Sequence, residues 1–244
     1  MEYSNIKGII FDYGGTLDTN GDHWSNVIRE GWEKAGVVAD DALFREAYVY
    51  GEQELERTQH ILPHHDFGDV LYIKMQIELG YLSSKGHFAP AQIDDKAKEI
   101  ADYCYSVAKA HTEKAKAVLE KLSKQYKLVL VSNFYGNINS VLKDFGLDVY
   151  FKKVIESAVV GIRKPDAGIF ELGVKALGYK PEEILVVGDS MKNDINPAKK
   201  IGCHTLLLTG RGWDQASILT PEDVESIDSL DEILGFLEGK AGDM

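Results

Sequence analysis

Carboxylates, a hydroxyl and an amide stand where three short apolar runs of this sequence end, and a separate loop carries a lysine. The residues are Asp12 after the first run, Ser132 and Asn133 after the second, Asp189 and Asp194 after the third, and Lys164 of Arg163-Lys164-Pro165. Carboxylates and backbone carbonyls suit a hard cation such as Mg²⁺. A hydroxyl, an ammonium and turn amides suit phosphate oxygens. These residue types therefore favour chemistry on a phosphorylated compound.

The apolar runs predict the strands that would bring these residues together. Short apolar stretches that end in small or polar residues are typical of buried parallel strands. Four are present, at Ile6–Asp12, Lys127–Ser132, Ile184–Gly188 and Thr205–Leu208. Amphipathic stretches of helix length accompany them, at Glu113–Gln125, Ala167–Leu177 and Ser190–Lys200. The alternation predicts an α/β fold, a Rossmann-like open parallel sheet flanked by helices, with ligands bound at the carboxyl ends of the strands.

A segment of different character separates the first strand from the second. From about Asn20 to Ala110 the periodicity is helical, with candidate helices at His23–Ala35, Asp41–Gln59, Asp66–Leu79 and Ala91–Lys109. Glycines and prolines, Gly80 among them, fall between these stretches. We therefore expect residues 1–19 and 111–244 to form an α/β core, and residues 20–110 to form an inserted helical domain.

Charge and composition exclude several classes of partner. Asp and Glu outnumber Lys and Arg by 39 to 27, giving a formal net charge of -12, which disfavours nucleic acids and anionic membranes. The first residues, Met1 to Lys7, contain no apolar signal stretch, and no apolar run approaches the roughly 18 residues of a spanning helix. Cys104 and Cys203 lack the spacing of a metal site and are expected to be reduced. We expect a cytoplasmic protein of unspecified oligomeric state.

Taken together, the motifs resemble those of the haloacid dehalogenase (HAD) superfamily of hydrolases. The matching segments, in the family's order, are Ile9-Ile10-Phe11-Asp12-Tyr13-Gly14-Gly15-Thr16-Leu17, Leu130-Val131-Ser132-Asn133, Lys164-Pro165-Asp166, and Gly188-Asp189-Ser190 through Asn193-Asp194. The helical insertion matches only in position and character, where it resembles the family's type 1 cap. The resemblance implies that the cap covers the active site and supplies substrate contacts.

The resemblance also implies catalytic and metal-binding roles. Asp12 would be the nucleophile that forms an aspartyl-phosphate, a known kind of covalent intermediate. Asp12, Asp189 and the backbone carbonyl of Gly14 would bind Mg²⁺. Lys164 would hold the phosphoryl group and offset the charge around Asp12. The implied reaction is magnesium-dependent hydrolysis of a small phosphorylated substrate, which is mostly positioning and charge neutralisation.

Further matched residues would bind the phosphate or support the catalytic groups. The resemblance implies that Ser132 binds the transferring phosphoryl group, and Asn133 of the same motif is assigned to phosphate binding with it. Asp194 would position Lys164 or a metal-bound water. Thr16, in the first motif, is assigned a supporting role.

Gly14 departs from the family pattern. In the phosphatases of the family a second Asp at this position protonates the leaving group and then activates water. Losing such help costs about 10² to 10⁴ in rate. A cap residue could donate the proton, the leaving group could need none, or the protein could bind phosphorylated ligands with little turnover. Candidate donors are Asp18, His60, His64 and His65. The simpler interpretation of Asp18 is turn formation, and that of the three histidines is a solvated loop.

Other side chains near the motifs have simpler explanations. Tyr13 and Trp24 are typical of core packing, and Arg29 and Lys34 are typical of a solvated helix face. None of the four is assigned to the site.

Two alternative functions stay open. HAD members that cleave carbon–halogen or carbon–phosphorus bonds also lack the second Asp. A dehalogenase does not need Mg²⁺, so the presence of Asp189 and Asp194 disfavours it, whereas phosphonate cleavage would need a desolvated cap lysine. The other alternative is a phosphate-binding protein without efficient turnover, for which Gly14 is the only support.

Overall fold

A single parallel sheet forms the centre of the part of the chain that the computed structural model describes, which is residue 3, residues 5–213 and residues 224–239. Its strands are β1 (Gly8–Phe11), β2 (Lys127–Ser132), β3 (Phe151–Glu156), β4 (Ile184–Gly188), β5 (His204–Leu208) and β6 (Ser226–Ile227). Their order is β3-β2-β1-β4-β5-β6, with every neighbouring pair parallel. This is the strand order of a doubly wound α/β fold, and it confirms the predicted sheet.

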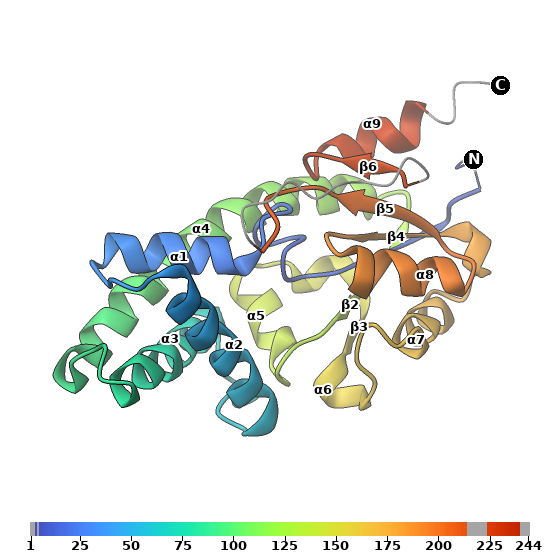
Figure 1. Ribbon diagram of the computed structural model, residues 1–244. Coiled ribbons are helices and arrows are strands. Elements are labelled where there is room, and N and C mark those ends of the chain that lie inside the picture. The colour runs from blue at the N-terminus through green and yellow to red at the C-terminus, as the bar shows by residue number, and fades with distance from the viewer. Residues whose placement is uncertain (1–2, 4, 214–223, 240–244) are drawn as a thin grey trace.

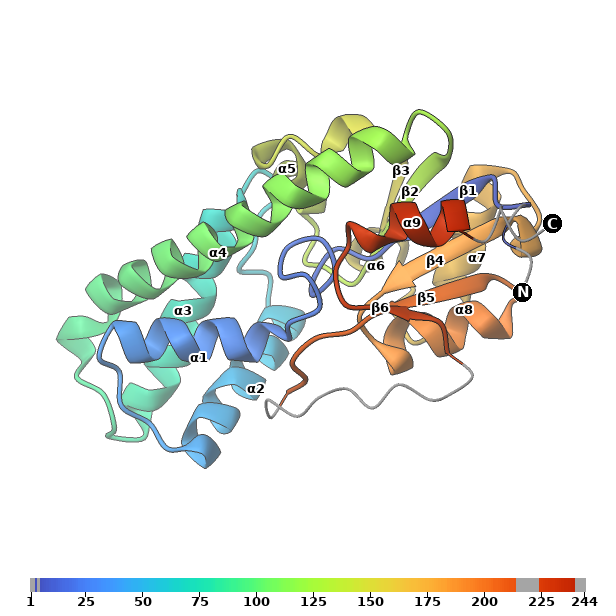
Figure 2. The same cartoon turned by 90° about the horizontal axis from the view of Figure 1, so that it is seen from above.

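Alternate residues of β1 point to opposite faces of the sheet, and helices cover both faces (Figures 1 and 2). Ile9 and Phe11 pack on the side of α4 (Ile93–Leu122), α5 (Ile138–Asp144) and α9 (Glu232–Gly239). Ile10 packs on the side of α7 (Gly168–Leu177) and α8 (Asn196–Lys200). Burial of the strand on both faces explains why its sequence is continuously apolar instead of alternating.

The helices α1 (Trp24–Lys34), α2 (Asp41–Arg57) and α3 (Phe67–Ser84) lie beside the sheet, together with the first half of α4 (Figure 2). Local sequence fixes where they begin. The side chains of His23, Asp40 and Asp66 each accept a hydrogen bond from a backbone amide in the first turn. Asp66 and Asp69 form a reciprocal capping box at the start of α3.

Two predicted helix limits were wrong. Helix α4 runs without a break for 30 residues, where the sequence predicted Ala91–Lys109 and a separate Glu113–Gln125. Its middle contains neither Gly nor Pro, and the Thr112 hydroxyl donates to the carbonyl of Ala108 at 2.9 Å, within the helix. Gly80 lies inside α3 and not between helices. The predicted division at residues 110 and 111 therefore falls within one helix, and the core and cap ranges stay a prediction.

The edge strand β3 was missed because its sequence, FKKVIE, is neither continuously apolar nor strictly alternating. The two-residue β6 is too short to be recognised, and β1 is shorter than the predicted Ile6–Asp12. Short helical turns complete the described chain: η1 (Pro90–Gln92), η2 (Asp148–Tyr150), α6 (Ser157–Val160), η3 (Pro181–Glu183) and η4 (Met191–Ile195).

Cys104 and Cys203 are both buried free thiols, as expected. Among the residues described above, no helix combines the length and apolar character needed to cross a bilayer.

Candidate active site

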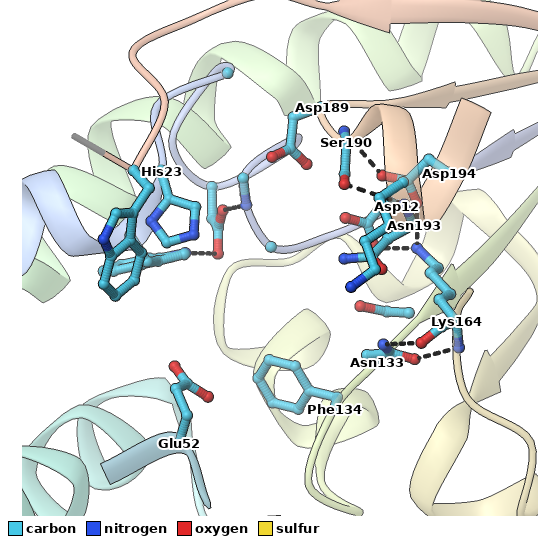
Figure 3. Close-up of a pocket in the computed structure, with 18 of the residues that line it drawn as sticks. Asp12, His23, Glu52, Asn133, Phe134, Lys164, Asp189, Ser190, Asn193 and Asp194 are labelled. Carbon is cyan, nitrogen blue, oxygen red and sulfur yellow. Dashed lines mark hydrogen bonds and ion pairs between the residues drawn. The ribbon is translucent and has the colours of Figure 1, made fainter. Parts of the chain in front are cut away.

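The strand ends bring the predicted residues to one edge of the sheet (Figure 3). Phe11 of β1 pairs in register with Leu130 of β2 and Val187 of β4, so the residues that follow in each strand lie close together. The amide of Asp12 continues this pairing by donating to the carbonyl of Val187 at 3.0 Å. Parallel geometry thus places Asp12 between the segments that carry the second and fourth motifs.

Lys164 lies between two carboxylates at the centre of the site. Its Nζ is 2.6 Å from Asp12 Oδ1 and 2.7 Å from Asp194 Oδ1, and its side chain is only 3% exposed. Burial works against a charged amine, yet the carboxylates of Asp12 and Asp194 raise the pKa of Lys164 above its ordinary value. Lys164 is therefore a fixed ammonium that orients one oxygen of each carboxylate.

Three carboxylates crowd around this single ammonium. One oxygen each of Asp12, Asp189 and Asp194 lie within 4.8 Å of one another. Burial and the neighbouring negative charges raise the pKa of Asp189 well above its usual range and that of Asp194 to about 6. A divalent cation held by hard oxygen ligands would relieve this repulsion. The donor set fits Mg²⁺.

The existing hydrogen bonds indicate which oxygens are left for a cation. Both oxygens of Asp194 are occupied, one by Lys164 and the other by the amide of Ser190 at 3.1 Å. Thr16 Oγ1 donates to Asp189 Oδ1 at 3.1 Å. Within the described chain, Oδ2 of Asp12 and Oδ2 of Asp189 receive no hydrogen bond. Asp12 and Asp189 are thus better placed than Asp194 to bind a metal.

The turn after Asp12 contains two glycines with different constraints. Gly15 has a φ of +91°, and a Cβ there would lie 2.4 Å from Asp189 Oδ2, so a side chain would displace that carboxylate. Gly14 has no positive φ, and an added Cβ would meet nothing within 4 Å. The backbone does not require glycine at position 14, and this position opens into the cavity.

Asn133 and Ser132 are both at the site but differ in what they contact. The Asn133 side chain accepts from the amide of Lys164 at 2.9 Å and donates to its carbonyl at 3.1 Å. It therefore fixes the loop that carries Lys164, which uses one of the two N–H groups of its side-chain amide. Ser132 is buried at the end of β2 and lines the cavity. The phosphate-binding roles of both residues stay predictions.

A cavity of about 590 Å³ extends from Asp12 to the helical insertion. Residues that sequence reasoning did not assign to a site line much of it: Trp24, Tyr48, Glu52, Phe67, Lys74, Phe134, Tyr135, Arg211 and Trp213. The position of Phe134, directly after the second motif, was a usable signal. The lining residues in helices had no such sequence signal, because an apolar stripe on a helix has the same pattern whether it lines a core or a cavity.

Among the proposed substitutes for the missing acid, Asp18 lines the cavity. The chain folds back at Asp18, which accepts from the amide of Gly15 at 2.8 Å and from Trp24 Nε1 at 3.0 Å. Burial raises the pKa of Asp18 to about 8, although both hydrogen bonds favour the charged form. The histidines His60, His64 and His65 are not among the cavity-lining residues.

A polar cluster lies among α2, α3 and the loop after β2. Lys74 of α3 pairs with Glu52 of α2, and Tyr135, from the loop after β2, donates to Glu52 at 2.9 Å. Glu78, one turn after Lys74, is fully buried, and neither carboxylate oxygen has a hydrogen-bond partner. Burial raises the pKa of Glu78 to about 8, Lys74 lowers it and Glu52 raises it further. Glu78 therefore retains its proton in the folded protein at neutral pH.

Replacing Glu78 by Gln should change how stability depends on pH. Because the folded-state pKa is raised from 4.5 to about 8, the wild-type protein loses stability as pH rises through that interval. Gln cannot ionise, so the melting temperature of the variant relative to wild type should increase between about pH 5 and pH 9. Thermal unfolding across this range tests it, with the exposed Glu113→Gln as control. A constant difference between variant and wild type would contradict a buried, protonated Glu78.

Comparison with known proteins identifies a family model that spans most of the chain. The model for haloacid dehalogenase-like hydrolases matches residues 6–202. This range includes all four motifs and the helical insertion.

Curated relatives match over shorter segments. A glyceraldehyde 3-phosphate phosphatase from Methanocaldococcus jannaschii is 36% identical over 98 residues, which cover 38% of this chain and 40% of the relative. Haloacid dehalogenase-like hydrolase domain-containing protein 3 from Bos taurus is 31% identical over 134 residues, 53% of each chain. The match therefore spans about half, or less, of the length of these relatives.

Solved structures show the same fold across nearly the whole chain. A dehalogenase with an intermediate complex aligns with a TM-score of 0.63 at 22% identity, covering 95% of this chain and 97% of that one. The putative HAD-hydrolase YfnB from Bacillus subtilis, bound to magnesium, aligns with a TM-score of 0.56 at 17% identity, covering 96% and 99%.

Proposed function

Because the chain belongs to the haloacid dehalogenase-like hydrolases, we propose that it is a magnesium-dependent phosphatase that acts through an aspartyl-phosphate on Asp12. The observation that carries the proposal is the buried ammonium of Lys164 between Asp12 and Asp194, with Asp189 beside them. Relatives named as phosphatases of glyceraldehyde 3-phosphate support a small phosphorylated substrate. The net charge of -12 supports a small molecule over a nucleic acid or an anionic membrane.

Each residue of the site has its own role in phosphoryl transfer. Asp12 attacks phosphorus, the bond to the leaving oxygen breaks, and water then hydrolyses the aspartyl-phosphate. Lys164 and Ser132 bind phosphoryl oxygens and fix them opposite Asp12. Asp194 holds Lys164 in place, with its other oxygen tied to the amide of Ser190.

Asp12, Asp189 and the carbonyl of Gly14 would hold Mg²⁺, and Thr16 orients Asp189 toward that position. When bound, the cation neutralises the charge that develops on the phosphoryl oxygens and lets an anionic substrate approach an anionic nucleophile. Asn133 contributes by bracketing the backbone of Lys164.

Phosphate release from para-nitrophenyl phosphate tests this proposal, because that leaving group departs without a proton. We expect turnover with Mg²⁺ and a decrease of at least about tenfold on chelation, restored by added Mg²⁺. Asp189→Asn should weaken the response to Mg²⁺, whereas the exposed Asp102→Asn should retain it. Turnover that is indifferent to chelation would contradict the metal site.

The alternative reactions have less support. Asp189 and Asp194 lie in one cluster with Asp12, as a metal-dependent enzyme needs and a dehalogenase does not. Lys74 is a buried cap lysine that lines the cavity, but its ion pair with Glu52 keeps it from acting as a free amine for phosphonate cleavage. We also propose that residues 1–19 and 111–244 form the core, that residues 20–110 form the cap, and that the protein is cytoplasmic.

A further inference from the structure

We propose that the substrate is the phosphate ester of an aromatic hydroxyl compound, whose ring lies against Trp24, Phe67 and Phe134. This inference rests on the proposed phosphatase function and narrows its substrate class. Two independent features of the cavity carry it: the chemistry of its titratable groups and the composition of its walls.

The first feature is that no carboxyl or imidazole group suited to protonating a leaving oxygen is found among the described lining residues. Position 14 carries no side chain. Burial raises the pKa of Asp18 to about 8, but N–H donors from Gly15 and Trp24 hold both of its oxygens within the turn. Burial lowers the pKa of His23 to about 4, and its Nδ1 accepts from the amide of Ser25 at 3.1 Å, so the ring is neutral.

The carboxyl and phenol groups on the cap side are also unsuited to this role. Although burial works in the other direction, Lys74 and Tyr135 hold the pKa of Glu52 below its usual value, so Glu52 carries no proton to donate. The phenols of Tyr48 and Tyr135 have pKa values raised well above normal by burial and by Glu52.

The cations that line the cavity are Lys74, Arg163, Lys164, Lys192 and Arg211. Ammonium and guanidinium groups are weak acids, with pKa values of about 10 to 13. Lys74 pairs with Glu52, and Arg211 pairs with Asp22 and Glu30. A leaving group must therefore depart as its anion.

This requirement selects among phosphate esters. A phenol ionises at a pKa of about 10, as tyrosine does, whereas an aliphatic alcohol ionises several units higher. An aryl phosphate can therefore lose its leaving group without protonation, while an alkyl phosphate is slower by about 10² to 10⁴.

The second feature is the aromatic wall of the cavity. The rings of Trp24 and Phe67 meet edge to face at 5.5 Å. Behind the wall, the buried ring of Tyr13 contacts Phe67 at 6.0 Å and Phe134 at 5.8 Å, both edge to face. Because Tyr13 directly follows Asp12, the rings that it supports are anchored beside the nucleophile. Figure 3 shows the ring of Phe134 beyond Asn133, turned toward the cap residue Glu52.

The size and lining of the cavity leave room for an organic group beyond the phosphate. Its volume of about 590 Å³ lies in the range of pockets that bind small organic ligands. Aliphatic side chains continue the apolar surface on the cap side: Ile28, Val70 and Leu71. Aromatic rings gain specific edge-to-face contacts in such surroundings, in addition to the burial of their surface.

Phenyl phosphate and cyclohexyl phosphate provide the first arm of the test, because they are similar in size and differ in the acidity of the leaving group. We expect kcat/KM to be at least about 10² higher for phenyl phosphate. Within a series of substituted phenyl phosphates, kcat/KM should decrease steeply as the pKa of the phenol rises. Equal rates for the phenyl and cyclohexyl esters would overturn the inference.

The second arm tests the ring contact, with acetyl phosphate as an activated substrate that has no ring. Phe134→Ala should lower the ratio of kcat/KM for phenyl phosphate to that for acetyl phosphate about tenfold. Phe134→Leu, which keeps most of the buried volume, should lower this ratio too. Phe145→Leu is the control, since Phe145 packs against Phe67 at 5.6 Å but does not line the cavity.

The outcomes separate this inference from the proposed function. Magnesium-dependent hydrolysis of acetyl phosphate, without the preference for phenyl over cyclohexyl phosphate, would refute the substrate class and leave the phosphatase function intact. An unchanged ratio in both Phe134 variants would refute the ring-binding role of the wall. Failure to hydrolyse any of the three compounds would count against the proposed function itself.

Discussion

Replacing Asp12 by Asn is expected to lower kcat by about 10⁴ to 10⁶, the range seen when a catalytic nucleophile or its partner is removed. Asn is nearly the same size as Asp, but its amide is a poor nucleophile and carries no charge for Lys164 or a cation. The fold should persist, because Lys164 keeps its second ion pair, with Asp194, at 2.7 Å.

Steady-state hydrolysis of para-nitrophenyl phosphate measures this effect, and thermal unfolding checks the fold. Asp102→Asn on the outer face of α4 is a matched control, since its carboxylate pairs with Lys98 far from the cavity lining. A retained rate in Asp12→Asn would mean that water attacks the substrate directly, without an aspartyl-phosphate.

Gly14→Asp should selectively increase kcat/KM for alkyl phosphates, by up to about 10² to 10⁴, with much less effect on kcat/KM for activated aryl phosphates. Only a poor leaving group gains from a proton in the transition state. The structure removes one obstacle to this experiment, because Gly14 has no positive φ and a Cβ there meets nothing within 4 Å. The added carboxyl can therefore enter the cavity without displacing a neighbour of the Cβ.

The matched control is Gly14→Asn, which adds nearly the same volume without an acidic proton. The two variants should differ in kcat/KM for cyclohexyl phosphate and agree closely for para-nitrophenyl phosphate. If Gly14→Asp is stable and binds Mg²⁺ but shows no selective gain, the active site uses another proton donor or a chemistry that never needed one.

The sheet edge was predictable because both its strands and its chemistry are encoded locally. Buried parallel strands give continuous apolar runs. The polar residues that follow these runs, such as Asp12 and Asp189, are therefore easy to recognise in the sequence. The register of β1 with β2 and β4 then follows from the fold, and the structure places these strand ends together.

Of the aromatic wall, only Phe134 had a local signal, its position directly after the second motif. The rest was not predictable, since the positions of the rings depend on contacts between distant segments. The loop that carries Phe134 is held by the end of β3, an edge strand that the sequence did not reveal, and by the first residue of α6. There, Ser157 Oγ accepts from the amide of Phe134 at 3.2 Å, and Glu156 accepts from the amide of Gly136 at 2.6 Å. Trp24 was assigned to the core because a helix stripe carries no information about which element it faces.

Of the two hydrogen bonds of Asp18, one could be predicted from the local sequence and the other could not. The bond from the amide of Gly15 joins residues three apart and is typical of an aspartate turn. The bond from Trp24 depends on where α1 begins relative to the sheet edge. Local turn chemistry was therefore foreseeable, whereas the burial that raises the pKa of Asp18 was not.

Detection of phosphate on Asp12 tests the central claim most directly. In the family's phosphatases the Asp at position 14 also activates water, so with Gly14 the second step should be slow and the aspartyl-phosphate should accumulate. Rapid acid quenching after mixing with Mg²⁺ and para-nitrophenyl phosphate, followed by peptide mass spectrometry, should find phosphate on the peptide that contains Asp12. A burst of para-nitrophenol should accompany it. Turnover in which no phosphate becomes attached to Asp12 and no burst is seen would contradict the mechanism.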